Sequence, residues 1–159
     1  MKIVIHIASQ HLELLDDAGQ LLHRYAVSTA LQGAGEVPGS FCTPRGAHII
    51  RAKIGVGCPE NTIFAARRPT GEIYTQELAA RFPGRDWILT RILWLSGCQI
   101  GFNRLGPNDT MRRYIYIHGM PDSEPAGVAK SHGCIRMHNT DLLELYEAVP
   151  AGTAVEIIE

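Results

Sequence analysis

The sequence predicts a single, mainly β domain with a sandwich-like architecture and a few short helices. Short apolar, β-prone segments recur along the chain, and 16 glycines and 9 prolines supply the turns between them. Helical spacing is clear in only one stretch, near the C-terminus. A chain of 159 residues, 45% of them hydrophobic, is long enough for one well-filled core. We therefore expect one domain over residues 1–159.

The first thirty residues are expected to form a β-meander. Strands are predicted over Lys2–Ala8, Gln10–Leu15 and Leu21–Thr29, with a turn at Asp16–Gly19. The next segment, Gly33–Gly46, is rich in glycine and proline. Because these residues interrupt regular structure, this segment is predicted to be a loop.

The middle of the chain alternates strands and loops. His48–Ala52 is a strand candidate, and Ile88–Trp94 is a strongly apolar, β-prone run. Between them, residues 55–70 lack a clear period and contain Pro59 and Pro69. This stretch is predicted to be a loop with at most a short strand.

The last third is expected to contain one strand, a loop, a helix and a closing strand. The strand Arg113–Ile117 would place His118 at its C-terminal end, and Met120–Lys130 suits an ordered but mobile loop. A closing strand is predicted over Thr153–Ile158. A helix is predicted before it, because apolar residues recur at helical spacing at Leu142, Leu145, Tyr146 and Val149. Residues 139–141 offer N-caps, and Pro150 ends the helix.

Charge and hydropathy exclude several classes of partner. The net charge is −1 and no basic run is present, which argues against nucleic acid and an anionic membrane surface. No segment approaches the roughly 20 apolar residues needed to span a bilayer. His6 interrupts the apolar run after Lys2, so this segment resembles a strand more than an export signal. We expect a cytoplasmic protein.

Four cysteines are spaced too irregularly for a paired zinc motif or a disulfide scaffold. Cys42, Cys58 and Cys98 are expected to be small, buried apolar residues. The fourth, Cys134, differs because its neighbours are small and polar. It lies within the run Ser131-His132-Gly133-Cys134-Ile135-Arg136-Met137.

Cys134 is the candidate nucleophile, since a thiolate attacks carbonyl carbon well and a nearby imidazole can generate it. Gly133 lets the backbone turn sharply beside the sulfur. His118, sixteen residues upstream, is the candidate base that takes the thiol proton and returns it to a leaving amine. The backbone N–H groups of Gly133 and Cys134 are natural donors to an oxyanion.

The remaining residues of the motif leave alternatives open. Arg136 has a planar guanidinium that could bind a substrate carboxylate, or could pin the loop through backbone carbonyls. His132 could bind substrate, orient the thiolate or be structural. Ser131 fits best as a loop-forming residue beside the substrate.

A zinc site is the main chemical alternative. His118, His132, Cys134 and His138 are all capable of binding metal. However, the chain lacks a His-Glu-x-x-His helix and paired Cys-x-x-Cys motifs. We expect neither a metal nor another cofactor.

The motifs together resemble the L,D-transpeptidase (YkuD-like) catalytic domain family. Beside Ser-His-Gly-Cys, the resemblance includes Thr43-Pro44-Arg45-Gly46, the segment Tyr114–Gly119 and the terminal Gly152–Val155, so it spans nearly the whole chain. It implies that the carbonyl of Gly119 holds the imidazole of His118 in the required tautomer. It also favours a substrate or orienting role for His132.

The resemblance implies cleavage of a peptidoglycan stem peptide after its third residue, with D-alanine leaving and a thioester forming on Cys134. Hydrolysis of the thioester would make the protein an L,D-carboxypeptidase that trims recycled muropeptides, which suits a cytoplasmic location. Transfer to an amine would make it an L,D-transpeptidase that forms 3→3 cross-links or exchanges D-amino acids. We expect the carboxypeptidase. A non-catalytic module that binds muropeptides is a further alternative, which labelling of Cys134 by a thiol probe would test.

Overall fold

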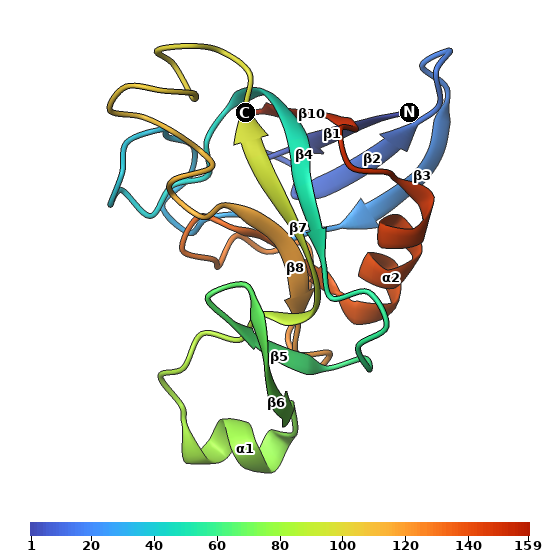
Figure 1. The fold of residues 1–159 in the computed structure, drawn as a ribbon, viewed down its shortest axis with the longest axis vertical. Coiled ribbons are helices and arrows are strands. Elements are labelled where there is room, and N and C mark those ends of the chain that lie inside the picture. The colour runs from blue at the N-terminus through green and yellow to red at the C-terminus, as the bar shows by residue number, and fades with distance from the viewer.

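The computed structural model describes residues 1–159 and contains ten strands and two helices (Figure 1). The strands, in chain order, are β1 (Lys2–His6), β2 (His11–Leu15), β3 (Leu21–Ala26), β4 (Gly46–Ile54), β5 (Thr62–Ala65), β6 (Arg68–Ile73), β7 (Leu89–Gly97), β8 (Tyr116–Met120), β9 (Ile135–His138) and β10 (Ala154–Ile158). The helices are α1 (Gln76–Arg81) and α2 (Asn139–Ala148). The prediction of a mainly β fold with few short helices is confirmed.

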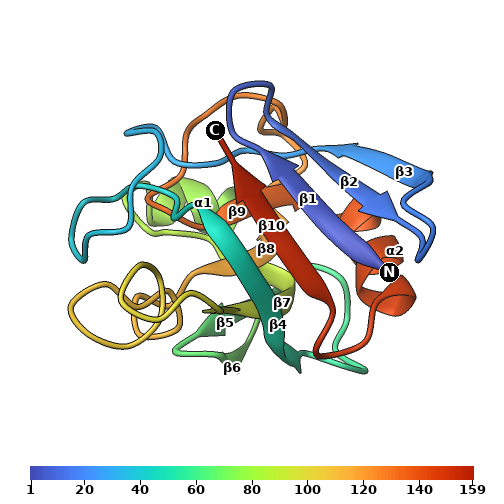
Figure 2. The ribbon, with the colours of Figure 1, turned by 90° about the horizontal axis from the view of Figure 1, so that it is seen from above.

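All ten strands belong to one curled sheet in the order β3-β2-β1-β10-β4-β7-β5-β6, with β8 paired to β7 and β9 paired to β8. The two ends of the chain meet in this sheet, because β10 runs parallel to β1 and antiparallel to β4 (Figure 2). Because parallel strands need long connections between them, β1 and β10 can pair although they lie at opposite ends of the sequence.

The core lies between the curled sheet and α2. Side chains alternate between two faces along a strand, and β1 and β2 follow this rule: Ile3, Ile5, Leu12 and Leu14 are buried and their neighbours are only partly buried. Helix α2 packs against β7, β8 and β9. Its apolar stripe contributes Leu142, Leu145 and Tyr146 to the same core cluster.

Strand β8 begins three residues later than the predicted strand Arg113–Ile117. Tyr114 has a φ of +56°, a left-handed conformation that lies outside the β region of regular strands. The turn before it is held by Asp109, whose carboxylate accepts the backbone N–H groups of Leu105 and Arg112. His118 therefore lies in the middle of β8 and not at its end.

The predicted loop over residues 55–70 is partly wrong, because it contains the start of a β-hairpin. Ala66 and Arg67 both have positive φ and form the tight turn between β5 and β6. Helix α1 follows, with the Thr75 hydroxyl accepting the Leu78 N–H as an N-cap. Hairpin and helix lie together at one end of the molecule (Figure 1). Neither helix of the fold has the length and apolar character that a membrane crossing requires.

Other elements also differ from the prediction. β3 ends at Ala26, before the predicted Thr29, and the motif itself forms an unpredicted strand, β9. Helix α2 begins at Asn139 with His138 in the N-cap position, and no side chain caps it. Asn139 is fully buried and is bonded elsewhere, so the expected N-cap role at this residue is wrong.

The expectation that three cysteines are buried apolar residues holds only in part. Cys58 is partly buried and packs beside Phe64, Ile92 and Tyr116. Cys42 is also partly buried, but Cys98 is exposed. All four cysteines are free thiols.

Candidate active site

The parallel pairing of β8 with β9 brings the two parts of the motif together. Ile117 lies opposite Ile135, and both are fully buried in the core. His118 lies opposite Arg136 on the other face, and Cys134 directly precedes β9. Because alternate residues share a face, His118, Cys134 and Arg136 project to the same side. All three line one cavity of about 120 Å³.

The Cys134 sulfur has two polar backbone neighbours. The Tyr116 N–H donates to Sγ at 3.3 Å, and Sγ lies 3.5 Å from the Tyr114 carbonyl, which accepts the thiol proton. Burial raises the pKa of the Cys134 thiol to about 12, and the charge of Arg113 opposes this only in part. The thiol therefore needs a base to remove its proton, which is the role predicted for His118.

The His118 imidazole is fixed in one orientation. Its Nδ1 lies 2.7 Å from the Gly119 carbonyl, so Nδ1–H donates and the Nε2 lone pair is left free. Burial lowers the pKa of His118, against the opposing charge of Asp86, which lines the same cavity. A neutral imidazole with a free lone pair is the form that accepts a proton. This is the contact with Gly119 that the resemblance implied.

Two hydroxyl groups hold the loop that carries the nucleophile. The Ser131 Oγ donates to the Cys134 carbonyl at 2.5 Å and accepts the Gly133 N–H at 3.2 Å. The Thr43 Oγ1 donates to the Gly133 carbonyl at 2.9 Å and accepts the Ala30 N–H at 3.0 Å. Gly133 has a φ of +128°, which an L side chain rarely adopts. Ser131 thus forms the loop, as its small polar side chain suggested.

Of the two expected oxyanion donors, one is already engaged. The Gly133 N–H is bonded to Ser131, whereas the Cys134 N–H makes no hydrogen bond within the protein. The Cys134 N–H is therefore free to donate to an oxyanion formed next to the sulfur.

Arg136 pairs with a carboxylate in this structure and not with the backbone carbonyls that were considered, and its role in binding a substrate carboxylate stays a prediction. Its guanidinium forms an ion pair with Glu124, which belongs to the loop after β8. The side chain is only 11% exposed, and its Nε has no hydrogen-bond partner. Arg136 therefore fixes the neighbouring loop through a carboxylate and keeps one unpaired N–H next to the cavity.

His132 is exposed at the centre of the site. It lines the central cavity and three adjoining hollows of about 290, 250 and 280 Å³. Its ring lies edge-on to Phe41, with 5.7 Å between centroids. His132 is therefore accessible to a substrate that enters any of these hollows.

The four residues considered as zinc ligands do not form a metal-binding cluster. His138 Nε2 is bonded to the Glu124 carbonyl at 2.9 Å, and His118 Nδ1 is bonded to Gly119. The group of close metal-capable side chains in this structure lies elsewhere, on β1 and β2. His118, His132 and Cys134 are instead arranged around the cavity as separate polar groups.

Sequence reasoning missed Asp86 and Arg113, which both line the cavity. Arg113 donates to the carbonyls of Gly35 at 3.1 Å and Cys42 at 2.6 Å, so it holds the 33–46 loop against the site. A basic residue just before an apolar strand was the available signal for Arg113. Asp86 lies in a stretch without a clear period, so the sequence contained no signal for its role. Thr43 was identified only as part of a motif.

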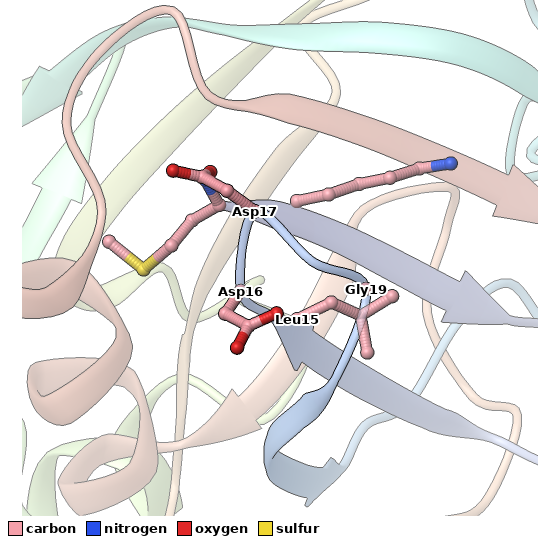
Figure 3. A pocket seen from close by; sticks show the side chains of 6 residues that line it. Leu15, Asp16, Asp17 and Gly19 are labelled. Atoms are coloured by element: carbon pink, nitrogen blue, oxygen red, sulfur yellow. The ribbon is translucent and has the colours of Figure 1, made fainter.

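A hollow of about 280 Å³ lies at the β2–β3 turn (Figure 3). Its walls include Leu15, Asp16 and Gly19, and Asp17 pairs with the α-amino group of Met1. No cysteine or histidine lines it. The nucleophile, the base and the free oxyanion donor are found only around Cys134, so that cavity is the candidate active site.

Comparison with known proteins agrees with this geometry. A model of the L,D-transpeptidase catalytic domain family, YkuD, matches residues 1–157. The chain therefore belongs to this family of cysteine-dependent acyl-transfer enzymes. YkuD of Bacillus subtilis strain 168, which bears the name of an L,D-transpeptidase, is 48% identical over 89 residues, which cover 56% of this chain and 44% of that protein.

Other relatives match over a shorter stretch of sequence or in fold. YbiS of Escherichia coli K12, named as a probable L,D-transpeptidase, is 39% identical over 61 residues, covering 34% of this chain and 20% of that protein. The structure of L,D-transpeptidase 3 from Mycobacterium tuberculosis in complex with a faropenem-derived adduct superposes with a TM-score of 0.59 at 18% identity. That alignment covers 99% of this chain and 59% of the other. The chain thus spans less than two thirds of these relatives.

Proposed function

We propose that this protein acts on peptidoglycan stem peptides, releasing the terminal D-alanine of a tetrapeptide through a thioester on Cys134. The observation that carries the proposal is the shared cavity of Cys134 and His118, in which a thiol, an oriented neutral imidazole and a free N–H meet. Membership of the L,D-transpeptidase family supports the choice of substrate.

The arrangement allows a balanced acyl transfer. As Sγ of Cys134 attacks the carbonyl carbon, the thiol proton passes to Nε2 of His118 and the oxyanion is held by the Cys134 N–H. The C–N bond then breaks, and His118 returns the proton to the departing D-alanine. A water molecule next attacks the thioester and gives its proton to His118, and the sulfur recovers a proton when the tripeptide leaves.

Hydrolysis is the proposed fate of the thioester. The cavity around the sulfur, at about 120 Å³, is the smallest of the hollows in and around the site. On the same measure about 10–15 Å³ is enough to hold one water molecule, so the cavity has room for water as a nucleophile. A water molecule also needs no binding site of its own beyond hydrogen bonds to His118.

Transpeptidation is the second candidate. Three further hollows border His132, so a donor and an acceptor peptide have more than one place to bind near the site. The related proteins from Bacillus subtilis and Escherichia coli are named as L,D-transpeptidases. A bound amine would compete with water, because positioning replaces a large effective concentration.

One experiment separates these fates. The protein is incubated with a disaccharide tetrapeptide, with and without D-methionine or a second stem peptide, and the products are identified by mass spectrometry. The proposal expects D-alanine and a tripeptide as main products under all conditions. Dominant exchange or dimer products at modest amine concentration would contradict hydrolysis and support transpeptidation, with the Cys134 thioester retained.

We also propose that the protein works in the cytoplasm, trimming stem peptides returned from the wall. The proposal rests on the hydrolytic fate proposed above, because hydrolysis needs only a released stem peptide and water and no polymeric wall as acceptor. Cell fractionation with an antibody against the protein tests it. Recovery in a periplasmic or wall fraction would contradict this location.

A further inference from the structure

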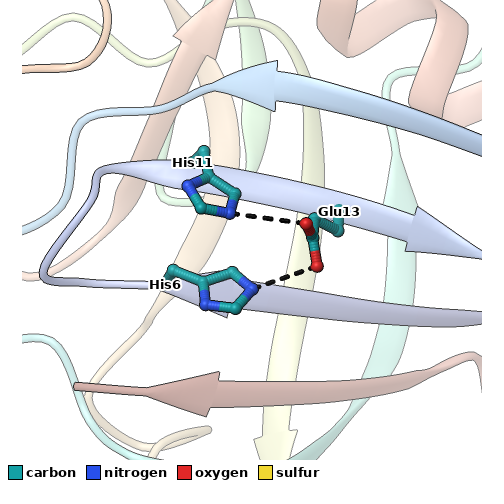
Figure 4. A group of neighbouring side chains, drawn as sticks. All are labelled: His6, His11 and Glu13. Atoms are coloured by element: carbon teal, nitrogen blue, oxygen red, sulfur yellow. Dashed lines mark hydrogen bonds and ion pairs between the residues drawn. The ribbon is translucent and has the colours of Figure 1, made fainter. Parts of the chain in front are cut away.

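A cluster of two histidines and one glutamate lies on β1 and β2, outside the active site. His6 and His11 are cross-strand partners, and Glu13 follows His11 by two residues on the same face. Figure 4 shows the three side chains turned toward one another. His6 Nε2 lies 3.1 Å from Glu13 Oε2, and His11 Nε2 lies 3.6 Å from Glu13 Oε1.

These separations match those of ligands around one small cation. Zinc binds imidazole nitrogen and carboxylate oxygen at about 2.0–2.2 Å, and tetrahedral geometry then sets its ligands about 3.3–3.5 Å apart. The 3.1 Å between His6 Nε2 and Glu13 Oε2 lies close to this value, and one ligand atom from each of the three residues lies within 4.8 Å of the others. We propose that His6, His11 and Glu13 bind a divalent transition-metal ion, with Zn²⁺ the best match and water completing the site.

The turn between the two strands holds the histidines in place. The buried Gln10 donates to the Ile7 carbonyl at 2.7 Å and to Thr29 Oγ1 at 2.6 Å, and it accepts the Thr29 N–H at 2.8 Å. The β1–β2 hairpin is thus anchored to the segment around Thr29 independently of any bound metal. A site that is already formed does not lose chain entropy on binding.

Outer contacts orient the ligand atoms. Ser9 Oγ lies 2.8 Å from His11 Nδ1, so the other ring nitrogen, Nε2, is left to face Glu13. Arg24 Nη2 donates to Glu13 Oε1 at 2.6 Å, so the other oxygen, Oε2, which faces His6, is the one that would bind the cation in place of its direct contact with that imidazole. Hydrogen-bonded imidazoles and carboxylates of this kind are typical around bound metals.

Burial is also suitable. The side chains of His6, His11 and Glu13 are 26%, 23% and 17% exposed, so the site is shielded but open to entry from solvent. Three protein ligands leave one position for water, and a bound ion would cross-link β1 to β2. We infer a bracing role for the metal in the hairpin, independent of the chemistry at Cys134.

The test is a titration of metal-free full-length protein with ZnCl₂ by calorimetry, together with Co²⁺ absorption spectra. We expect the wild-type protein to bind one equivalent of Zn²⁺ at this site. The affinity for Zn²⁺ should be at least about tenfold weaker in the variants His6→Asn and His11→Asn. His23→Asn, an exposed histidine on β3, is the matched control and should bind as the wild type does. The Co²⁺ complex should lack a thiolate charge-transfer band, which separates this site from the cysteines.

Glu13→Gln provides a second variant should a histidine variant misfold, which circular dichroism will show. It removes the carboxylate charge but keeps an oxygen for Arg24, and it too should weaken binding. Zinc should raise the melting temperature of the wild type and of His23→Asn but not of the three ligand variants. Equal zinc affinity in the wild type and the ligand variants, a thiolate band in the Co²⁺ spectrum, or no binding at micromolar zinc would overturn the proposal.

Discussion

Cys134 is one of four free thiols, and its position beside His118 should make it the only one required for turnover. We expect Cys134→Ala to abolish D-alanine release with the fold intact, because the substitution removes only the sulfur. His118→Ala should slow release by about 10²–10⁴-fold, the usual contribution of a general acid–base. Mass spectrometry of the products measures both rates. Cys98→Ser, at an exposed thiol, is the control, and near-normal activity of Cys134→Ala would refute the mechanism.

The reactivity of the resting thiol should depend on pH in a particular way. Because the pKa of Cys134 is raised to about 12 by burial, the thiolate fraction at pH 7 is very small and rises about tenfold per pH unit below the pKa. The rate of alkylation by iodoacetamide should therefore increase continuously from pH 6 to 10. Peptide-level mass spectrometry distinguishes Cys134 from the other thiols. A plateau near neutral pH would instead reveal a thiolate–imidazolium pair.

His48 should make the fold sensitive to acid. It is 2% exposed and bonded to Thr110 and Gly46, and burial lowers its pKa from 6.5 to about 4. Between these values the unfolded chain binds a proton and the folded chain does not, so stability falls as the pH drops from 6.5 to 4. A shift of this size corresponds to about 3 kcal/mol.

Urea unfolding at pH 7, 5 and 4 measures this effect. His48→Gln should lose less free energy of unfolding on acidification than the wild type, because the titrating group is gone. His23→Gln, at an exposed position, should lose as much as the wild type. The same acid dependence in His48→Gln and wild type would show that other groups cause it.

At the scale of elements, the loop carrying the nucleophile depends on Thr43, which comes from a distant part of the chain. Thr43→Val keeps the shape but leaves the Ala30 N–H and the Gly133 carbonyl unpaired in a buried place. We expect a loss of about 1–3 kcal/mol in the free energy of unfolding and a lower kcat. Thr43→Ser retains the hydroxyl and should restore much of both. Chemical denaturation and product assays measure them, and equal behaviour of the two variants would contradict this role.

The position of His118, the candidate base, also depends on packing between elements. A β-bulge in β7 lies between the residues that pair with Gly119 and His118. Thr90, in this bulge, has a φ of +75° and bonds to the buried Asn139 of α2. Asn139 lies against Gly119, where an added Cβ would meet its side-chain oxygen at 2.2 Å. The glycine after His118 is thus needed for close packing as well as for its carbonyl.

At the scale of the whole molecule, the last strand joins the two halves of the sheet. β10 lies between β1 and β4, and its Val155 and Ile157 are almost fully buried. Deletion of residues 154–159 should therefore abolish cooperative unfolding, because it removes two strand pairings and core side chains at once. Circular dichroism melts measure this. Deletion of Glu159 alone removes only an exposed ion pair with Arg45 and should change little. A cooperative transition in the longer deletion would contradict this role of β10.

The sequence by itself determined the mainly β class, the family and the identity of Cys134, His118 and their neighbours, because those features are local. Alternating apolar residues indicate strands directly, and a motif such as Ser131–Met137 is contiguous. The start of β8 was misplaced because the left-handed Tyr114 has no sequence signal, and the β5–β6 hairpin was missed because prolines obscure its period.

Only the tertiary structure decided how the site is assembled and how its groups titrate. Asp86 and Arg113 reach the cavity, and Thr43 reaches the loop that carries the nucleophile, from separate segments of the chain. Contacts between distant segments leave no regular period in the sequence. The protonation states of Cys134 and His118 follow from burial, which depends on how the sheet closes around them. Residue types thus specified the reaction chemistry, whereas the fold set the geometry and solvent exposure in which that chemistry operates.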